Sequence, residues 1–313
     1  MERELPENRL RNGYMKRLIL ILVLVSSCAG VTPLKSQKTK VTLAEKQFFD
    51  VYNGKVTFIS LSTQLSDGVH QITCKEQESP KPLIKSFRAS VTNGVLEFFY
   101  AEGYHSQAKK HFCFIADKKL FEVNVSQFKY AKERLNVDQR RVVLSKKDKA
   151  RSAREWHLTQ KLYKQSPGKS FADGEFSVPL DSFITSHYGK KRIFNNLKKT
   201  QHLGNDFRAK VGTPIPASNR GKIVFAGDLF YTGNVVIIDH GLDIFTLYGH
   251  LSKINVKAGA MVKKGDIIGL SGKTGRVSGP HLHWGVKING FNIDGFSLVN
   301  ESKLSVSKHE MVN

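Results

Sequence analysis

Alternating apolar and polar residues dominate the first half of the chain beyond residue 41. The runs 55–59 (KVTFI) and 95–99 (VLEFF) place apolar side chains at every second position, as half-buried strands do. Asn-Gly and Asp-Gly pairs, which favour tight turns, lie between such runs. Residues 41–144 are therefore predicted to form an N-terminal, β-sandwich-like domain of several short strands.

A different pattern begins at Ser145. The sequence Ser145-Lys146-Lys147-Asp148 resembles a capping box, and a polar segment with widely spaced apolar residues follows it. The run Ser166-Pro167-Gly168 would end this segment. Residues 145–168 are predicted to form a helical linker between two domains.

The C-terminal region is rich in glycine and β-branched residues. Its apolar runs include 222–225 (KIVF), 235–238 (VVII) and 266–269 (DIIG), which are typical of buried strands. Residues 170–300 are therefore expected to form a second, all-β domain, and the chain as a whole a mainly β protein.

The N-terminus carries the features of an export signal. Lys16 and Arg17 precede the apolar run 18–25 and then Ser26-Ser27-Cys28, and this run is too short to span a bilayer as a helix. The acidic residues before Met15 suit such a signal poorly, so Met15 is the expected start. Residues 25–28 (VSSC) resemble a lipobox, in which Cys28 would carry a lipid anchor; an ordinary cleaved signal is the alternative. Either interpretation exports the protein, to the periplasm or outer membrane.

Composition narrows the choice of partner only a little. The 313 residues include 49 Lys and Arg against 27 Asp and Glu, a formal net charge of +22, which predicts attraction to an anionic partner. No basic helix with interleaved aromatic residues is evident, and export argues against nucleic acid. An anionic cell envelope is the better candidate. Export also permits disulfides, so Cys74 and Cys113 could pair.

Three short fragments of the C-terminal region carry the chemistry: residues 202–206 (HLGND), 248–251 (YGHL) and 279–284 (GPHLHW). The spacing of His281 and His283 puts both imidazoles on one face of a strand. His202 and Asp206 could converge where a loop bends into a strand. One carboxylate and two imidazoles form a zinc site that leaves one position open, and the bound Zn²⁺ would lower the pKa of a water molecule and polarise a carbonyl.

These fragments, in this order and approximate spacing, resemble those of the M23 metallopeptidases of the LytM/lysostaphin type, over about residues 184–298. The resemblance implies that His202, Asp206 and His283 hold Zn²⁺ and that His250 and His281 serve catalysis. It also implies that the substrate is the peptide part of bacterial peptidoglycan, whose cross-links the enzyme would hydrolyse. Relatives commonly carry a proline after the position of Asp294, where this chain has glycine.

Other interpretations remain open. Some relatives of this type lack metal ligands and activate other wall hydrolases, so a non-catalytic regulator is the main alternative. The expected bond is a D-Ala to diaminopimelate cross-link rather than a glycine bridge, because a lipobox and two domains suggest a Gram-negative envelope. The N-terminal domain could have a role in binding, in positioning, or in occluding the groove of the C-terminal domain. Trp284 is expected in the core, and His187 and His240 are expected to be structural.

Overall fold

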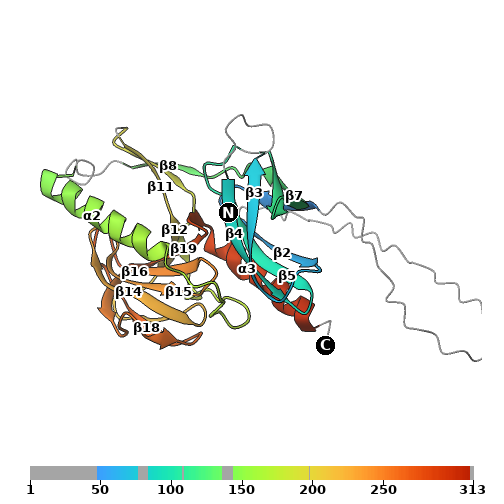
Figure 1. Ribbon diagram of the computed structural model, residues 1–313. Coiled ribbons are helices and arrows are strands. Elements are labelled where there is room, and N and C mark those ends of the chain that lie inside the picture. Colours follow the sequence, from blue (N-terminus) through green and yellow to red (C-terminus); the bar gives the residue numbers. More distant parts are fainter. Residues whose placement is uncertain (1–47, 77–83, 108, 136–143, 197, 311–313) are drawn as a thin grey trace, which may run out of the picture. The chain divides into compact units, whose positions relative to one another are not determined.

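The computed structural model describes residues 48–76, 84–107, 109–135, 144–196 and 198–310 (Figure 1). Strands dominate these residues, which confirms the mainly β fold class. The predicted export segment, residues 1–28 with Cys28, lies outside the described residues. Within the described part of the chain, no helix is both long enough and apolar enough to cross a membrane.

The N-terminal sheet contains seven strands in the order β1-β7-β6-β3-β4-β5-β2. Their bounds are β1 Phe48–Tyr52, β2 Val56–Ser62, β3 Gly68–Glu76, β4 Ile84–Thr92, β5 Val95–Ala101, β6 Lys110–Ile115 and β7 Lys118–Ser126. The end strands β1 and β2 also contact each other, so the sheet is barrel-like. The expected strands at 55–59 and 95–99 correspond to β2 and β5, and alternate residues such as Ile59, Phe87 and Phe121 fill the core.

A disulfide between Cys74 and Cys113 joins β3 to β6. The two residues face each other in the antiparallel register, and both are fully buried. The pairing that the sequence allowed is therefore present. It closes a loop with a sequence separation of 39 residues inside the N-terminal sheet.

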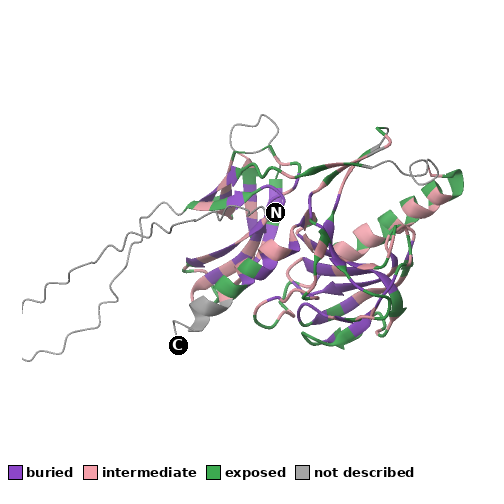
Figure 2. Cartoon of the chain, turned by 180° about the vertical axis from the view of Figure 1, so that it is seen from behind, coloured by how far each residue is buried: buried purple, intermediate pink, exposed green. Residues whose placement is uncertain are grey.

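Helix α2 spans Lys146–Tyr163 and confirms the helix expected after Ser145. The Ser145 hydroxyl accepts a hydrogen bond from the backbone N–H of Asp148, which satisfies one of the free donors at the helix start. None of the helix residues is buried. Figure 2 shows the same pattern, with exposed and intermediate residues along the whole of α2 and buried residues concentrated on the strands.

The C-terminal sheet has the main strand order β17-β14-β15-β16-β19-β12-β9, with β13, β18 and β20 paired at its sides. The bounds are β9 Ile184–Ser186, β12 Gly204–Arg208, β13 Pro214–Pro216, β14 Gly221–Leu229, β15 Gly233–Asp239, β16 Ile244–Ile254, β17 Met261–Val262, β18 Ile267–Ser271, β19 His281–Ile288 and β20 Phe291–Ile293. Tyr248 and Trp284 are fully buried in its core. The expected position of Trp284 is therefore confirmed.

The expectation that the C-terminal region is all-β was wrong at its end, where α3 spans Gly295–Glu310. Helix α3 packs against β2 of the N-terminal sheet. The Glu301 carboxylate accepts a hydrogen bond from the backbone N–H of Phe58. Among the described side chains of α3 only a few apolar residues are buried, among them Leu298 and Val299, so this part of the helix has no strong apolar periodicity. Contact with β2 stabilises it.

A small sheet that the sequence did not predict contains β11 (Lys198–Gln201), β10 (Lys191–Phe194) and β8 (Lys132–Leu135), in that order. Strands β10 and β11 form an antiparallel hairpin, whereas β8 runs parallel to β10. The hairpin leads directly into His202. A segment that follows the N-terminal sheet in the chain is thus hydrogen-bonded to the hairpin that precedes the candidate site.

Candidate metal centre

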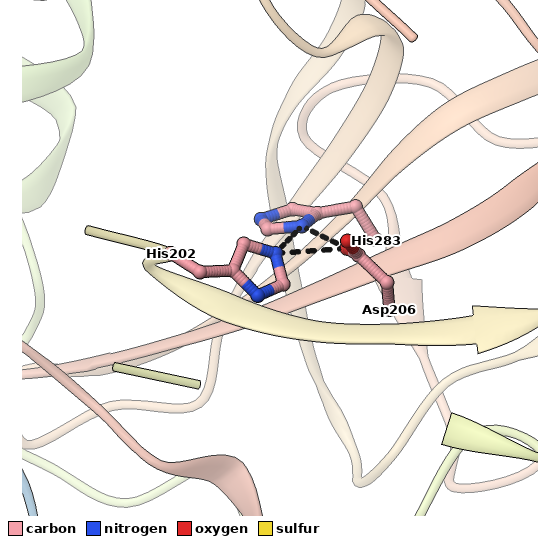
Figure 3. Close-up of side chains that lie close together, drawn as sticks. All are labelled: His202, Asp206 and His283. Carbon is pink, nitrogen blue, oxygen red and sulfur yellow. Dashed lines mark hydrogen bonds and ion pairs between the residues drawn. The ribbon is translucent and has the colours of Figure 1, made fainter. Parts of the chain in front are cut away.

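The antiparallel pairing of β12 with β19 brings two of the predicted ligands together. Asp206 lies directly opposite His283 in the register, so the two side chains leave the sheet on the same face. His202 precedes β12 by two residues and reaches the same point from the adjoining loop. Figure 3 shows the three side chains converging.

The three facing atoms are close enough to share one ion. His202 Nε2 lies 2.9 Å from Asp206 Oδ1 and 3.2 Å from His283 Nδ1. His283 Nδ1 lies 2.7 Å from the same carboxylate oxygen. Ligands of a tetrahedral Zn²⁺, each about 2.0–2.2 Å from the metal, lie roughly 3.3 Å apart. The donor set and its spacing therefore fit zinc.

The hydrogen bonding of His202 strengthens this interpretation. Its Nδ1 lies 3.0 Å from the backbone carbonyl of His187, which can only accept, so Nδ1 carries the proton and Nε2 presents a lone pair. That lone pair faces a carboxylate oxygen, and two acceptors at 2.9 Å repel unless a cation lies between them. A metal ion would supply that cation, and the His187 carbonyl would orient the ligand as outer partners of metal-bound histidines do.

The two remaining histidines of the predicted site lie beside the ligands. The ring centroids of His250 and His281 are 4.7 Å apart, and those of His250 and His283 are 5.9 Å apart. His281 Nδ1 lies 2.9 Å from the carbonyl of Gly279, and His250 Nδ1 lies 2.9 Å from the carbonyl of Thr274. Both carbonyls fix the proton on Nδ1, which leaves Nε2 of each ring able to accept one.

The backbone of His250 is unusual for a residue with a side chain. Its φ is 63°, in the left-handed region, although it belongs to strand β16. Such a conformation costs on the order of 1–3 kcal/mol and persists where the surroundings enforce it. Here the backbone N–H donates to the carbonyl of Thr232 at 2.7 Å. The hydrogen bonds to Thr232 and Thr274 together hold the backbone and the imidazole of His250 beside the ligands.

The site favours the neutral forms of His202 and His250 and the ionised form of Asp206. Burial lowers the pKa of His202, more than Asp206 raises it. Burial also lowers the pKa of His250 to about 3, assisted by the positive charges that His283 and His281 would carry. Burial alone would raise the pKa of Asp206, but its contacts with His202 and His283 hold that pKa well below its usual range. These are the protonation states that metal binding requires.

The other histidines singled out in the sequence are elsewhere. His240 is fully buried between the carbonyl of Arg220 and the hydroxyl of Thr246. The His187 side chain is exposed, and only its carbonyl reaches the site. Sequence reasoning missed several residues that contribute, among them Thr274, Ser186 and Arg192. No motif assigned any of the three to the site, and each reaches it only through the fold.

A cavity of about 310 Å³ adjoins the ligands on the face that carries His283. Trp156 and Tyr163 of α2 line one side of it, and Phe245 and Leu247 of the sheet line the other. The cavity is mostly apolar and open to solvent. It offers space for a peptide chain next to the candidate metal site.

Comparisons with known proteins agree with this geometry. The model of Peptidase family M23 matches residues 200–295. The peptidoglycan DD-endopeptidase ShyA of Vibrio cholerae is 39% identical over 152 residues, which cover 48% of this chain and 35% of the relative. The DD-carboxypeptidase/endopeptidase Mpg of Neisseria meningitidis is 43% identical over 97 residues, covering 31% of this chain and 22% of the relative.

A solved structure from Pseudomonas aeruginosa, described as a candidate peptidase M23, is similar over a larger share of the chain. It has a TM-score of 0.59 and 25% sequence identity, and the similarity covers 80% of this chain and 95% of that one. The chain spans about a third or less of the length of the two curated relatives. From the ligand geometry and these similarities, the C-terminal part of this chain is a peptidase M23 domain.

Proposed function

We propose that this protein is a zinc-dependent endopeptidase that hydrolyses peptide cross-links of bacterial peptidoglycan. The observation that carries the proposal is the convergence of His202 Nε2, Asp206 Oδ1 and His283 Nδ1, with His250 and His281 beside them. The relatives support the substrate, since ShyA and Mpg are both named for endopeptidase activity, ShyA on peptidoglycan.

The chemistry follows from the residues at the site. When bound, Zn²⁺ supplies a Lewis acid that activates water and polarises the peptide carbonyl. The Nε2 atoms of His250 and His281 can accept a proton from the attacking water and return one to the leaving amine. Their Nδ1 bonds to Thr274 and Gly279 hold the rings in the tautomer that this task needs. His281 Nε2 lies 3.7 Å from the Asp206 oxygen, close to the ligand set.

The finer assignments also belong to the proposal. The bond cut is a D-Ala to diaminopimelate cross-link, which the DD-endopeptidase names of the relatives support. The protein acts outside the cytoplasm, where peptidoglycan is found, with residues 1–28 as its export signal and Cys28 as a lipid anchor. Its formal net charge of +22 suits an anionic cell envelope.

Purified protein incubated with sacculi tests the proposal, with mass spectrometry of the released muropeptides. We expect cross-linked dimers to become monomers, and the reaction to stop with a chelator or with His283→Ala. The matched control is His187→Ala, because only the backbone of His187 reaches the site. If the wild type binds no zinc and cuts no cross-link, while His283→Ala keeps the cellular phenotype, the chain is a regulator and the proposal is wrong.

A further inference from the structure

Arg192 of β10 contacts the candidate ligand Asp206 at the carboxylate oxygen opposite to the one that faces the imidazoles. One of its terminal nitrogens donates to Ser186 Oγ at 2.7 Å and lies 3.4 Å from Asp206 Oδ2. This is the carboxylate oxygen that does not face the two imidazoles. The guanidinium therefore leaves Oδ1 free for the metal and fixes how the carboxylate is turned.

The same guanidinium also reaches a second ligand. Ser186 Oγ, which accepts from Arg192, lies 3.3 Å from Nδ1 of His202. Arg192 thus connects to Asp206 directly and to His202 through one hydroxyl. Two of the three candidate ligands share this single support, and its side chain is only 24% exposed.

Strand β8 supplies the partner of Arg192. Glu133 lies opposite Arg192 in the parallel register, and its carboxylate is 3.8 Å from Arg192 Nε. The Lys190 side chain also pairs with Glu133, at 3.3 Å, but Lys190 reaches His202 only with its backbone carbonyl, which accepts a hydrogen bond from the His202 N–H at 3.0 Å. The segment that follows the N-terminal sheet therefore contributes a charged group to the support of the metal site.

We infer that Arg192 is a positioning residue for Asp206 and His202, and that Glu133 on β8 holds Arg192 in place. The inference rests on the proposed function, because it concerns the same metal site. It gives β8 a role in metal binding, whereas the model of Peptidase family M23 matches only residues 200–295.

The sign of the effect on zinc affinity distinguishes positioning from simple charge. A cation near Asp206 repels Zn²⁺, so if Arg192 acted only through its charge, Arg192→Gln would raise the affinity. If it orients the ligands, the same change lowers the affinity, by about 10- to 100-fold as for other outer-shell partners. Arg192→Lys, which keeps the charge and one donor group, should recover part of the loss.

The experiment measures zinc affinity of the full chain by competition with a chromophoric chelator, and melting temperature of the metal-free protein. We expect Arg192→Gln to lower the affinity, Glu133→Gln to lower it less, and Lys190→Gln to leave it unchanged. Glu133→Gln should add nothing in an Arg192→Gln background, because Glu133 acts through Arg192.

Three outcomes would contradict these proposals, and each has its own meaning. Wild-type protein that fails to bind zinc overturns the proposed function itself. Wild-type protein that binds zinc, together with an Arg192→Gln variant of equal or higher affinity, overturns the positioning role alone. A variant that loses affinity only in proportion to its lost thermal stability also contradicts that role, since a merely structural residue would do the same.

Discussion

Two buried polar clusters in this molecule each contain a carboxylate and an imidazole, but they differ in whether the chain itself balances the charge of the carboxylate. In the N-terminal sheet, Glu102 contacts Lys85 with one oxygen and accepts a hydrogen bond from Tyr100 with the other. His111 lies 3.4 Å from the second oxygen. The side chains of Lys85, Glu102 and His111 are at most 1% exposed. The negative charge of Glu102 is balanced by a cation of the chain itself.

At the candidate metal centre the carboxylate is left incompletely balanced. Asp206 Oδ1 faces the Nε2 lone pair of His202 and the Nδ1 atom of His283, while the only cation of the described residues near it, Arg192, contacts the other oxygen. In the first cluster, formed by Lys85, Tyr100, Glu102 and His111, the charge is balanced within the chain; we call it the closed cluster, and it stabilises the fold. The second cluster needs an ion from outside the chain. The difference shows that burial and unusual pKa values alone do not identify a functional site. What identifies it is the set of potential ligand atoms that converge on one place.

The largest expected effect comes from removing a ligand. His283→Ala should lose zinc and lower the rate of cross-link hydrolysis by more than about 100-fold, because even outer-shell changes at zinc sites cost 10–100-fold. Zinc content by mass spectrometry and muropeptide release measure this. The metal-free melting temperature should stay close to that of the wild type, in contrast to a change in the N-terminal cluster.

Substitution of a catalytic histidine should lower the hydrolysis rate without removing the metal ion. We expect His250→Ala to lower the hydrolysis rate by about 10²- to 10⁴-fold, the usual contribution of a proton-transfer group, while zinc content stays close to that of the wild type, because His250 is not among the three candidate ligands. Rate and zinc content are measured on the same sample. Loss of both together would move His250 from the catalytic group to the ligand group.

Breaking the closed cluster should affect stability without affecting zinc. Glu102→Gln leaves Lys85 buried without its partner, which we expect to cost about 3–5 kcal/mol of unfolding free energy. The double change Lys85→Met with Glu102→Leu should cost less, because no charge stays buried. Urea denaturation measures both, and chelator competition should give unchanged zinc affinity. A fall in zinc affinity with Glu102→Gln would mean that the two clusters are coupled.

Acid should weaken the closed cluster. Burial would raise the pKa of Glu102, but the hydrogen bond with His111 and the charge of Lys85 outweigh it and lower that pKa to about 2, from an ordinary value of 4.5. A lowered folded-state pKa stabilises the fold above pH 4.5, and this contribution, about 3 kcal/mol, is lost as pH falls towards 2. Unfolding free energy measured across this range should therefore fall less steeply in Glu102→Gln.

Short-range patterns made much of the site predictable. The spacing of His281 and His283 on one strand and the bend between His202 and Asp206 depend only on local geometry, and the structure brings these residues together. The alternation in β2 and β5 and the cap at Ser145 are local as well. Each of these predictions needed no knowledge of distant contacts.

The features that sequence reasoning missed depend on contacts between distant parts of the chain. Arg192 acquires its role from the antiparallel pairing of β9 with β12, which places Ser186 opposite Asp206, and from Glu133, which is nearly 60 residues away in the sequence. Helix α3 is stabilised against β2, from the opposite end of the described chain. A single sequence without such contacts contains no signal for either.

The parallel pairing of β8 with β10 also bears on how the peptidase part can be produced alone. A shortened protein that begins at residue 170 would leave Lys191–Phe194 as an open edge strand, with unpaired backbone groups that invite association with a second chain. The same truncation would remove helix α2 and one wall of the cavity. A recombinant fragment suited to crystallisation should therefore start upstream of Lys132, so that the native edge remains covered.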